Sequence, residues 1–283
     1  MPIVGLVNPG EMGASVGAAA AGGGNDVRWA SIGRSEATRK RAKRAGLTDC
    51  GTLSKLVNGA EIILSVCPPH SAQDVAEAVA SLGFDGIYVD ANAISPLKTR
   101  QIENVIKRSG ATFVDGSITG GPAWNMGSTT VLHLSGRDCG PVAALFSGSP
   151  FNVNVVSDRI GAASALKMAF AANTKGVTAL LTAILGLAEQ EGVRDQLESL
   201  WGDKLTAQVH RRVAVNTAKA WRFAGEMNEI ADTFAAAGLP NGFHLAAART
   251  FDRVAVFRHW KVPPSIEELL QVLLDDSLTN SKS

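Results

Sequence analysis

Residues 3–22, IVGLVNPGEMGASVGAAAAG, contain a short apolar run, a turn rich in small residues and a helix-forming segment. This order predicts a strand, a tight loop and a helix, in which the loop reads Asn8-x-Gly10-x-x-Gly13. Gly10 would let the backbone approach a pyrophosphate, and Gly13 would let the helix meet the sheet. Asn8 replaces the usual first glycine, and asparagine tolerates the left-handed backbone conformation better than most residues. The first turn therefore predicts a dinucleotide site, with a purely structural turn as the alternative.

The chain beyond this segment alternates between β-rich apolar runs and helix-length stretches rich in alanine or polar residues. In addition to residues 3–7, strands are expected at 27–32, 62–66, 87–90, 112–115 and 131–135. Strands that alternate with helices indicate a doubly wound, mostly parallel sheet. We therefore expect an α/β Rossmann domain that binds NAD(P) over residues 1–158.

The character of the sequence changes near Arg159. Residues 160–192 form an apolar and small-residue segment without proline, which predicts one long buried helix. Later segments up to Asp276 also favour helix, so an all-α C-terminal domain for substrate binding and dimerisation is expected over residues 159–283. The long helix has more apolar circumference than one small domain covers, which indicates a homodimer. The polar end, residues 275–283, is expected to fray.

The overall composition excludes several classes of protein. With 46% hydrophobic and 19% charged residues, the chain of 283 residues can bury its cores without a disulfide or metal scaffold. The 27 basic and 26 acidic residues leave a net charge of +1, which gives no general attraction to nucleic acid or membranes. Three scattered cysteines form no CxxC pair, and the histidines lack zinc-ligand spacing. We expect a cytoplasmic protein without a metal, because neither an export signal nor a membrane segment is indicated.

The segment after the second strand, residues 30–46 (ASIGRSEATRKRAKRAG), bears on the choice of dinucleotide. At the end of this strand a carboxylate normally binds the ribose 2′-hydroxyl of NAD, and none stands there. Arg34 and Ser35, with Arg39 as a further candidate, offer a guanidinium and a hydroxyl suited to a 2′-phosphate. The sequence thus favours NADP (NADPH) over NAD, while a solvated helix face explains most of the other basic residues.

Six stretches in order resemble motifs of the β-hydroxyacid dehydrogenase superfamily, which includes 3-hydroxyisobutyrate dehydrogenase, tartronate semialdehyde reductase and 6-phosphogluconate dehydrogenase. They are VGLVNPGEMG at 4–13, IGRS at 32–35, SVCPPH at 65–70, VDANAISP at 89–96, VDGSITGGPAWNMGSTTVLHLSG at 114–136 and IGAASALKMAFAAN at 160–173. The resemblance spans nearly the whole chain, and the C-terminal run is similar to a less studied branch with a divergent helical domain. It implies hydride transfer with a nicotinamide cofactor.

The same resemblance implies roles for individual residues. Lys167 aligns with the family's catalytic lysine, and Thr119, Gly120 and Gly121 align with its substrate loop. The residues that it implies for cofactor binding are Asn8, Pro9, Gly10, Glu11, Met12, Gly13, Arg34, Ser35, Cys67, Pro68 and Asn92.

The chemistry of hydride transfer explains why a lysine would be needed. Reduction of a carbonyl builds negative charge on oxygen, and a partly desolvated lysine can deliver the proton. Lys167 is therefore the expected general acid/base, with a solvated surface lysine as the alternative. At 100° per residue Thr174 returns to within about 20° of Lys167, so Thr174 is expected to bind substrate where the family's asparagine, aligned with Ala171, is missing. Lys175 could raise the positive potential of the same cleft.

Three functions stay open at this point. The expected one is NADP-dependent interconversion of a hydroxy acid, or a related alcohol, and its carbonyl form, with a small carboxylate as substrate. Imine reduction is the nearest alternative, because imine reductases resemble the same superfamily but usually lack the lysine. A catalytically silent nucleotide-binding relative is suggested by Asn8, Ala171 and Gly225, which depart from the family pattern. Glu226 and His244 could line the substrate site, but residues of this kind are more often structural.

Overall fold

The structure is a computed structural model that describes residues 1–275 and divides into two compact units. The first unit is Met1–Lys167, and the second begins at Met168. The sequence predicts a boundary after residue 158, and the two units divide further along, within helix α7 (Ala162–Ala171). Residues 276–283, which belong to the segment expected to fray, lie outside the described residues.

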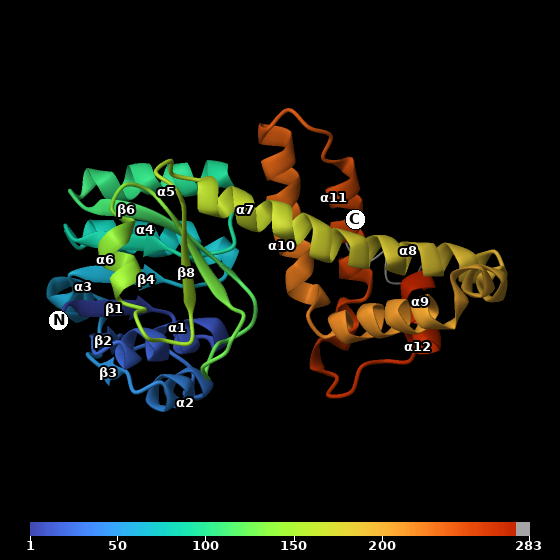
Figure 1. Cartoon of the computed structure of the whole chain (residues 1–283), viewed down its shortest axis with the longest axis horizontal. Coiled ribbons are helices and arrows are strands. Elements are labelled where there is room, and N and C mark those ends of the chain that lie inside the picture. The colour runs from blue at the N-terminus through green and yellow to red at the C-terminus, as the bar shows by residue number, and fades with distance from the viewer. Residues whose placement is uncertain (276–283) are drawn as a thin grey trace. The chain divides into compact units, whose positions relative to one another are not determined.

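A mostly parallel sheet forms the frame of the first unit (Figure 1). The bounds of its strands are β1 Ile3–Val7, β2 Asp26–Trp29, β3 Thr48–Asp49, β4 Ile62–Ser65, β5 Ile87–Asp90, β6 Thr112–Thr119, β7 Val131–Ser135 and β8 Asn152–Ser157. The strand order is β3-β2-β1-β4-β5-β6-β7-β8, and β6 and β7 are the one antiparallel pair of this sheet. The strand order reverses between β1 and β4. In α/β proteins, ligands bind in the crevice at the carboxyl ends of the strands next to such a reversal. The predicted Rossmann fold is confirmed.

The strands differ from the prediction in number and length. β3 and β8 are additional: β3 has two residues, and every residue of β8 is at least partly exposed, so neither has the apolar run of a buried strand. β2 ends at Trp29 instead of Ile32, whose side chain is exposed. β6 continues to Thr119, past the apolar residues that reveal its first half.

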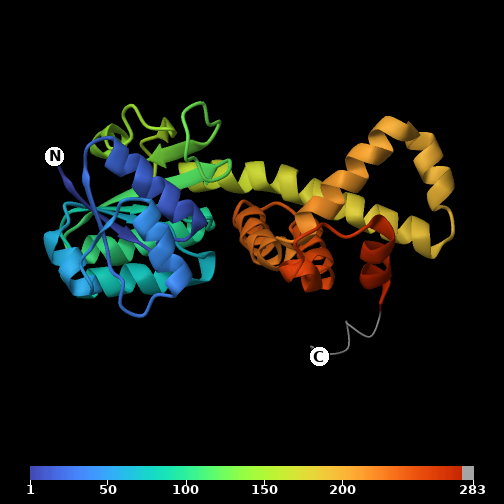
Figure 2. The same cartoon turned by 90° about the horizontal axis from the view of Figure 1, so that it is seen from below.

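Helices cover both faces of the sheet, as Figure 2 shows from a second direction. Their bounds are α1 Glu11–Gly22, α2 Glu36–Arg44, α3 Leu53–Gly59, α4 Ala72–Ser81, α5 Pro96–Arg108 and α6 Cys139–Ala144, with a 3₁₀ turn at Pro69–Ser71. α1, α2 and α6 pack on one face around residues such as Val16, and α3, α4 and α5 pack on the other around residues such as Ile102. α1 lies directly on β1, because a Cβ at Gly17 would come within 2.8 Å of Leu6.

The second unit is built from helices throughout its described part. After α7, a π-helical turn at Ala172–Gly176 leads into α8 (Val177–Gln190), and together they form the long helix that the sequence predicts. The remaining helices are α9 Arg194–Thr217, α10 Ala220–Ala236, α11 Gly242–Arg253 and α12 Ile266–Leu274, with a 3₁₀ turn at Ala255–His259. α10 and α11 lie side by side (Figure 1), and α8 contacts α9, α11 and α12. The predicted all-α C-terminal region is confirmed.

The long helix is less buried than predicted. Ala162–Gln190 is long and apolar enough, by length and composition only, to cross a membrane, and 39% of its most apolar window is buried. Leu185 faces the core of the second unit, whereas Leu180 and Leu187 are exposed. Core helices of soluble proteins share this length and composition, so these properties do not by themselves assign a membrane span.

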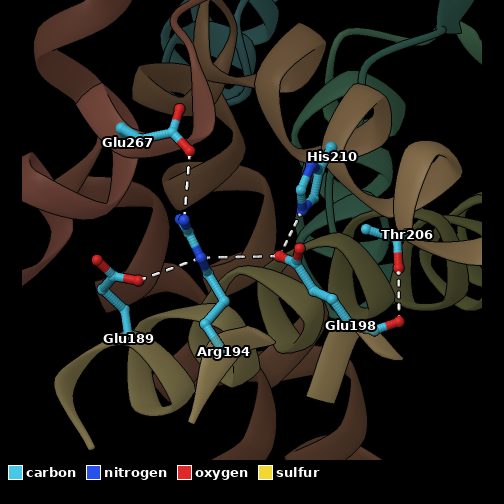
Figure 3. A network of polar contacts seen from close by, with 6 residues as sticks. All are labelled: Glu189, Arg194, Glu198, Thr206, His210 and Glu267. Atoms are coloured by element: carbon cyan, nitrogen blue, oxygen red, sulfur yellow. Dashed lines mark hydrogen bonds and ion pairs between the residues drawn. The ribbon is translucent and has the colours of Figure 1, made fainter. Parts of the chain in front are cut away.

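A charged network joins three helices of the second unit (Figure 3). Arg194, at the start of α9, forms ion pairs with Glu189 of α8 (3.3 Å), Glu198 of α9 (3.8 Å) and Glu267 of α12 (3.4 Å). His210 extends the network, since its Nε2 lies 2.8 Å from Glu198 Oε1. A mostly buried arginine shared among several carboxylates holds its neighbours more firmly than an isolated surface pair does. The network therefore fixes the turn between α8 and α9 next to α12.

Candidate functional site

The loop between β1 and α1 has the geometry of a dinucleotide turn. Asn8 has a φ of 69°, so it adopts the left-handed conformation that a glycine usually supplies here. A Cβ on Gly13 would lie 2.5 Å from the Asn8 carbonyl oxygen, so the helix can meet the strand only if this residue is glycine. A Cβ on Gly10 would meet no heavy atom of the described chain within 4 Å. The fold itself thus requires Gly13 but leaves space beside Gly10.

The N-terminus of α1 suits an anion. Gly10 is the N-cap of α1 and, being a glycine, has no side chain to cap the helix. The N–H groups of Glu11, Met12 and Gly13 have no acceptor within the helix, and the helix dipole favours negative charge at this end. The space beside Gly10 and these three N–H groups together fit a pyrophosphate.

Arg34 and Ser35 lie next to this turn, at the start of α2. Arg34 Nη1 lies 3.4 Å from Asn8 Oδ1. The Ser35 hydroxyl caps α2 by accepting a hydrogen bond from the Thr38 N–H (3.3 Å). Arg39 donates to a backbone carbonyl oxygen in the preceding loop (2.9 Å). A guanidinium, a hydroxyl and a helix N-terminus therefore meet at the place expected for the adenosine ribose.

Cys67, Pro68 and Asn92 lie where β4 and β5 end. Asn92 is 2% exposed; its Oδ1 accepts a hydrogen bond from the Cys67 N–H (2.6 Å), and its Nδ2 donates to the Ser65 hydroxyl (3.2 Å). Asn92 thus ties the two strand ends together, and its side chain is occupied within the protein. Burial raises the pKa of the Cys67 thiol to about 11, so the thiol is neutral at physiological pH.

A buried carboxyl, that of Asp90, lies at the end of β5, next to Asn92. Asp90 is 1% exposed, and its Oδ1 accepts a hydrogen bond from the Asn92 N–H (3.0 Å). Its Oδ2 has no hydrogen-bond partner within residues 1–275, and the buried Tyr88 hydroxyl has none there either. Burial raises the pKa of Asp90 to about 7, so a large fraction of this carboxyl is protonated at neutral pH.

The predicted substrate loop follows β6 and is held rigidly. Gly120 has a φ of 110°, and a Cβ there would lie 2.6 Å from the Thr130 hydroxyl oxygen, so only glycine fits. The Thr130 hydroxyl donates to the Gly121 carbonyl oxygen (2.7 Å). Thr119 Oγ1 lies 2.9 Å from His133 Nε2. Thr119, Gly120 and Gly121 therefore form one fixed turn.

Lys167 lies beside this turn, at the end of the first unit. Its Nζ donates a hydrogen bond to the carbonyl oxygen of Ile118 (2.7 Å), the residue before Thr119. The side chain is half-buried. Burial and, secondarily, the Lys167 charge lower the pKa of His133, which places the ammonium group near that imidazole as well. The first unit thus brings the predicted catalytic lysine and the predicted substrate loop together.

The start of α7 is anchored by a buried carboxyl. Asp115 Oδ2 accepts hydrogen bonds from the N–H groups of Gly161 (3.0 Å) and Ser164 (3.1 Å) and from the Ser135 hydroxyl (2.8 Å), while Oδ1 accepts one from the Ser164 hydroxyl (2.6 Å). Burial raises the pKa of Asp115, and these hydrogen bonds oppose that rise. Asp115 therefore holds the helix that carries Lys167 against β6 and β7.

His133 is a site residue that the sequence motifs miss. It lies in β7, opposite Ser117 of β6 and directly beside Asn154 of β8. The register of β7 against β6 is not readable from the sequence, so nothing there brings His133 to the substrate loop. The one signal is the alternation in β7, where buried Leu132 and Leu134 flank a polar residue that must face away from that core.

The remaining predicted residues, Thr174, Lys175, Glu226 and His244, belong to the second unit. Lys175 forms an ion pair with Glu226, and both side chains are mostly buried. Glu226 thus balances the charge of Lys175 locally. The expectation that Lys175 raises the positive potential of the substrate cleft is wrong. Thr174 lies in the π turn, where the α-helical rotation of 100° per residue does not hold. The rotation therefore does not place Thr174 beside Lys167, and its substrate role stays a prediction. His244 is buried, and burial lowers its pKa.

Two family models match the chain. Residues 3–138 match the NAD binding domain of 6-phosphogluconate dehydrogenase, and residues 185–254 match a domain of unknown function, DUF1932. An uncharacterized 28.5 kDa protein of the 7S RNA 5′ region of Methanothermus fervidus is 33% identical over 173 residues. That match covers 61% of this chain and 65% of the relative, so it spans less than two thirds of the relative's length.

Solved structures are also similar. A conserved protein of unknown function, described as structurally similar to 3-hydroxyacid dehydrogenases, is 26% identical with a TM-score of 0.66, covering 90% of this chain and 98% of its own. A 3-hydroxyisobutyrate dehydrogenase from Mycobacterium tuberculosis is 17% identical with a TM-score of 0.69, covering 97% and 100%. An imine reductase from Myxococcus stipitatus, solved with NAD+, is 16% identical with a TM-score of 0.57, covering 97% and 100%. The last two likenesses concern the fold alone.

Proposed function

We propose that this chain, which belongs to the β-hydroxyacid dehydrogenase superfamily, is an NADP-dependent enzyme that interconverts a hydroxy acid, or a related alcohol, and its carbonyl form. Its N-terminal domain is an NAD(P)-binding domain, and the chain is an oxidoreductase of this superfamily. The single observation that carries the finer proposal is the position of Lys167, which reaches the Ile118 carbonyl oxygen at the edge of the turn formed by Thr119, Gly120 and Gly121.

The preference for NADP rests on the start of α2. Arg34 lies within 3.4 Å of Asn8 in the dinucleotide turn, and Ser35 caps α2 beside it. The N–H groups of Glu11 to Gly13 would hold the pyrophosphate, while Arg34 and Ser35 would hold the 2′-phosphate. When bound, the nicotinamide would supply or accept the hydride.

Lys167 would handle the proton of this reaction. As an ammonium group it would donate a proton to the oxygen of a carbonyl that has received a hydride, and the product would be an alcohol. In the reverse direction the neutral amine would take the hydroxyl proton. Thr119 and the backbone of Gly120 and Gly121 would orient the substrate's carbonyl or carboxylate oxygens.

The cofactor preference is tested by calorimetric titration of the whole chain with NADPH and NADH. We expect NADPH to bind at least tenfold more tightly, which corresponds to about 1.4 kcal/mol. Arg34→Ala should remove most of that difference, because it removes the guanidinium, while leaving NADH binding nearly unchanged. Equal affinity for both nucleotides would overturn the preference, and binding of neither would overturn the enzyme assignment.

The role of Lys167 is tested with Lys167→Met, which keeps the length of the side chain but removes the amine. Glyoxylate and longer semialdehydes serve as probes of carbonyl reduction with NADPH. We expect turnover to fall by roughly 100-fold or more while NADPH affinity is retained. The matched control is Lys107→Met, because Lys107 is an exposed lysine on α5. Full activity of Lys167→Met would reject Lys167 as the general acid/base.

Imine reduction is the second candidate, favoured by the likeness of fold to an imine reductase. The presence of Lys167 favours carbonyl chemistry over it. Pyrroline and glyoxylate, compared at equal NADPH, separate the two: faster turnover of pyrroline that survives Lys167→Met would establish imine reduction. NADPH binding without turnover of either probe would indicate the silent relative.

We further propose that the chain acts as a homodimer in the cytoplasm, with a small carboxylate as substrate and with neither nucleic acid nor membrane as a partner. The exposed apolar side chains Leu180 and Leu187 of α8 support the dimer, because a second copy would cover them. The thiols of Cys50, Cys67 and Cys139 are free, which fits a reducing compartment.

A further inference from the structure

We propose that Asn154 and His133 fix the Thr119 hydroxyl as a hydrogen-bond donor toward the substrate, so that this turn selects an acceptor group, a carbonyl or carboxylate oxygen, over a protonated amine or iminium. The inference rests on the proposed function, because it takes the turn after β6 as the substrate site. His133 and Asn154 are positioning residues in it, since they act through Thr119.

The three side chains form a line across three strands. Thr119 ends β6, His133 lies in β7 and Asn154 lies in β8, where the register sets it directly beside His133. Asn154 Nδ2 lies 3.3 Å from His133 Nδ1, and His133 Nε2 lies 2.9 Å from Thr119 Oγ1. Each ring nitrogen of the imidazole thus has one partner.

The chemistry of these groups determines which of them donates and which accepts each hydrogen bond. The amide nitrogen of Asn154 can only donate, so His133 Nδ1 must accept and carries no proton. A neutral imidazole has a single N–H, which is then on Nε2 and donates to Thr119 Oγ1. Burial, with a smaller contribution from the Lys167 charge, lowers the pKa of His133 and so favours this neutral form.

Because His133 donates to Thr119, the hydroxyl proton of Thr119 remains available for the substrate. A hydroxyl that accepts from His133 keeps its own O–H for another acceptor. Lys167, whose ammonium group also donates, lies near the same turn. Two donors that converge on one place stabilise an oxygen with negative charge and repel a group that carries its own N–H. With the opposite tautomer, Thr119 would donate to His133 and could accept from an iminium.

The tautomer can be read without any substrate. Long-range ¹H–¹⁵N spectra of protein labelled with ¹⁵N-histidine distinguish a protonated from an unprotonated ring nitrogen, and His133→Gln identifies the His133 signals by their loss. At pH 7.5 we expect His133 with Nε2 protonated and Nδ1 unprotonated. In Asn154→Ala we expect a mixture of tautomers, because the donor to Nδ1 is gone. An Nδ1-protonated His133 in the parent chain, or an unchanged tautomer in Asn154→Ala, would overturn the proposal.

The consequence for the substrate is tested by binding in the presence of NADP+, which permits no hydride transfer to a carbonyl. Titrations with glyoxylate compare His133→Gln, whose amide can still donate to Thr119, with His133→Leu, which cannot. We expect glyoxylate affinity to fall roughly tenfold in His133→Leu and to stay within about twofold in His133→Gln, as for loss of one hydrogen bond to a charged group. Val156→Asp, at an exposed residue of β8, controls for general changes in that strand.

The outcomes separate this inference from the proposed function. Equal glyoxylate affinity in His133→Leu and the parent chain would reject the role of His133, and so would tighter binding of pyrroline than of glyoxylate by the parent chain. Failure to bind NADP+ at all would reject the proposed function, whereas the tautomer measured by NMR would still report on the line from Asn154 to Thr119.

Discussion

Asp115 is the residue on which the position of α7 most directly depends. Asp115→Asn keeps the size of the side chain but turns an amide donor toward N–H and O–H groups that need an acceptor. We expect the free energy of unfolding to fall by about 3 kcal/mol, because buried donors lose their acceptor. Urea unfolding followed by circular dichroism measures this change. The same substitution at exposed Asp85 should change it by less than about 0.5 kcal/mol, and equal effects at both positions would contradict the anchoring role.

Asp90 predicts a pH dependence of stability. Its pKa of about 7 in the folded state lies above the ordinary value of 3.8, so the folded chain holds this proton more tightly than the unfolded chain does. The stabilising contribution is therefore complete below about pH 4 and is lost as the pH rises through 7. Between pH 5 and 8 the parent chain should lose roughly 2 to 3 kcal/mol relative to Asp90→Asn, which stays neutral.

Urea unfolding of the parent chain and Asp90→Asn at several pH values measures that difference. Asn keeps the oxygen that accepts from the Asn92 N–H, so the substitution changes mainly the titration. A constant difference between the two chains across this range would show that Asp90 does not titrate there.

At the scale of the element, Gly10 and Gly13 at the N-terminus of α1 serve different purposes: Gly13 is required by packing, and Gly10 leaves space for the proposed phosphate. Gly13→Ala should destabilise the fold by roughly 2 kcal/mol or more, because the new Cβ would lie 2.5 Å from the Asn8 carbonyl oxygen. Gly10→Ala should leave stability within about 0.5 kcal/mol, since its Cβ meets empty space, yet weaken NADPH binding at least tenfold. Thermal unfolding and calorimetric titration of the two variants measure both effects. Unchanged NADPH affinity in Gly10→Ala would show that no phosphate lies against this residue.

Buried strands were the part of the fold that the sequence predicted best. In an α/β pattern, a short apolar run such as Ile3–Val7 is typical of a buried strand. β8 was not predicted because the segment is exposed or only partly buried, and its alternating valines and asparagines lack the continuous apolar run of the buried strands. The π turn was not predicted because its polar residues and Gly176 do not by themselves indicate an extra residue in a helical turn.

The candidate site was predictable only where its residues belong to one local motif. The dinucleotide turn is continuous in sequence, so its glycines and Asn8 could be identified directly. Lys167 was reached through a family resemblance, since periodicity alone does not distinguish it from a surface lysine. His133 and Asn154 are brought to Thr119 by strand register, which the sequence of β7 and β8 does not encode in any readable pattern.

At the scale of the whole molecule, the exposed apolar side of α8 predicts the state of association. Leu180 and Leu187 lie seven residues apart on this helix, hence on one face, and are 44% and 65% exposed. We expect the chain to be a dimer by light scattering, and Leu180→Glu combined with Leu187→Glu to produce monomers, because charge on this face opposes burial. Leu200→Glu, at an exposed leucine of α9, should remain dimeric. A monomeric parent chain would contradict the proposal.

The π turn at Ala172–Gly176 also bears on how the helix tolerates changes in length. A π turn contains one residue more than an α-helical turn, so an extra residue can be accommodated there without rotating the helix faces on either side. Removal of one residue here, such as exposed Asn173, would close the turn into regular α-helix and keep Leu185 directed at its core. The same deletion within α8 would turn every later side chain by about 100°. Natural relatives that differ by one residue in this helix should therefore carry the difference at this turn.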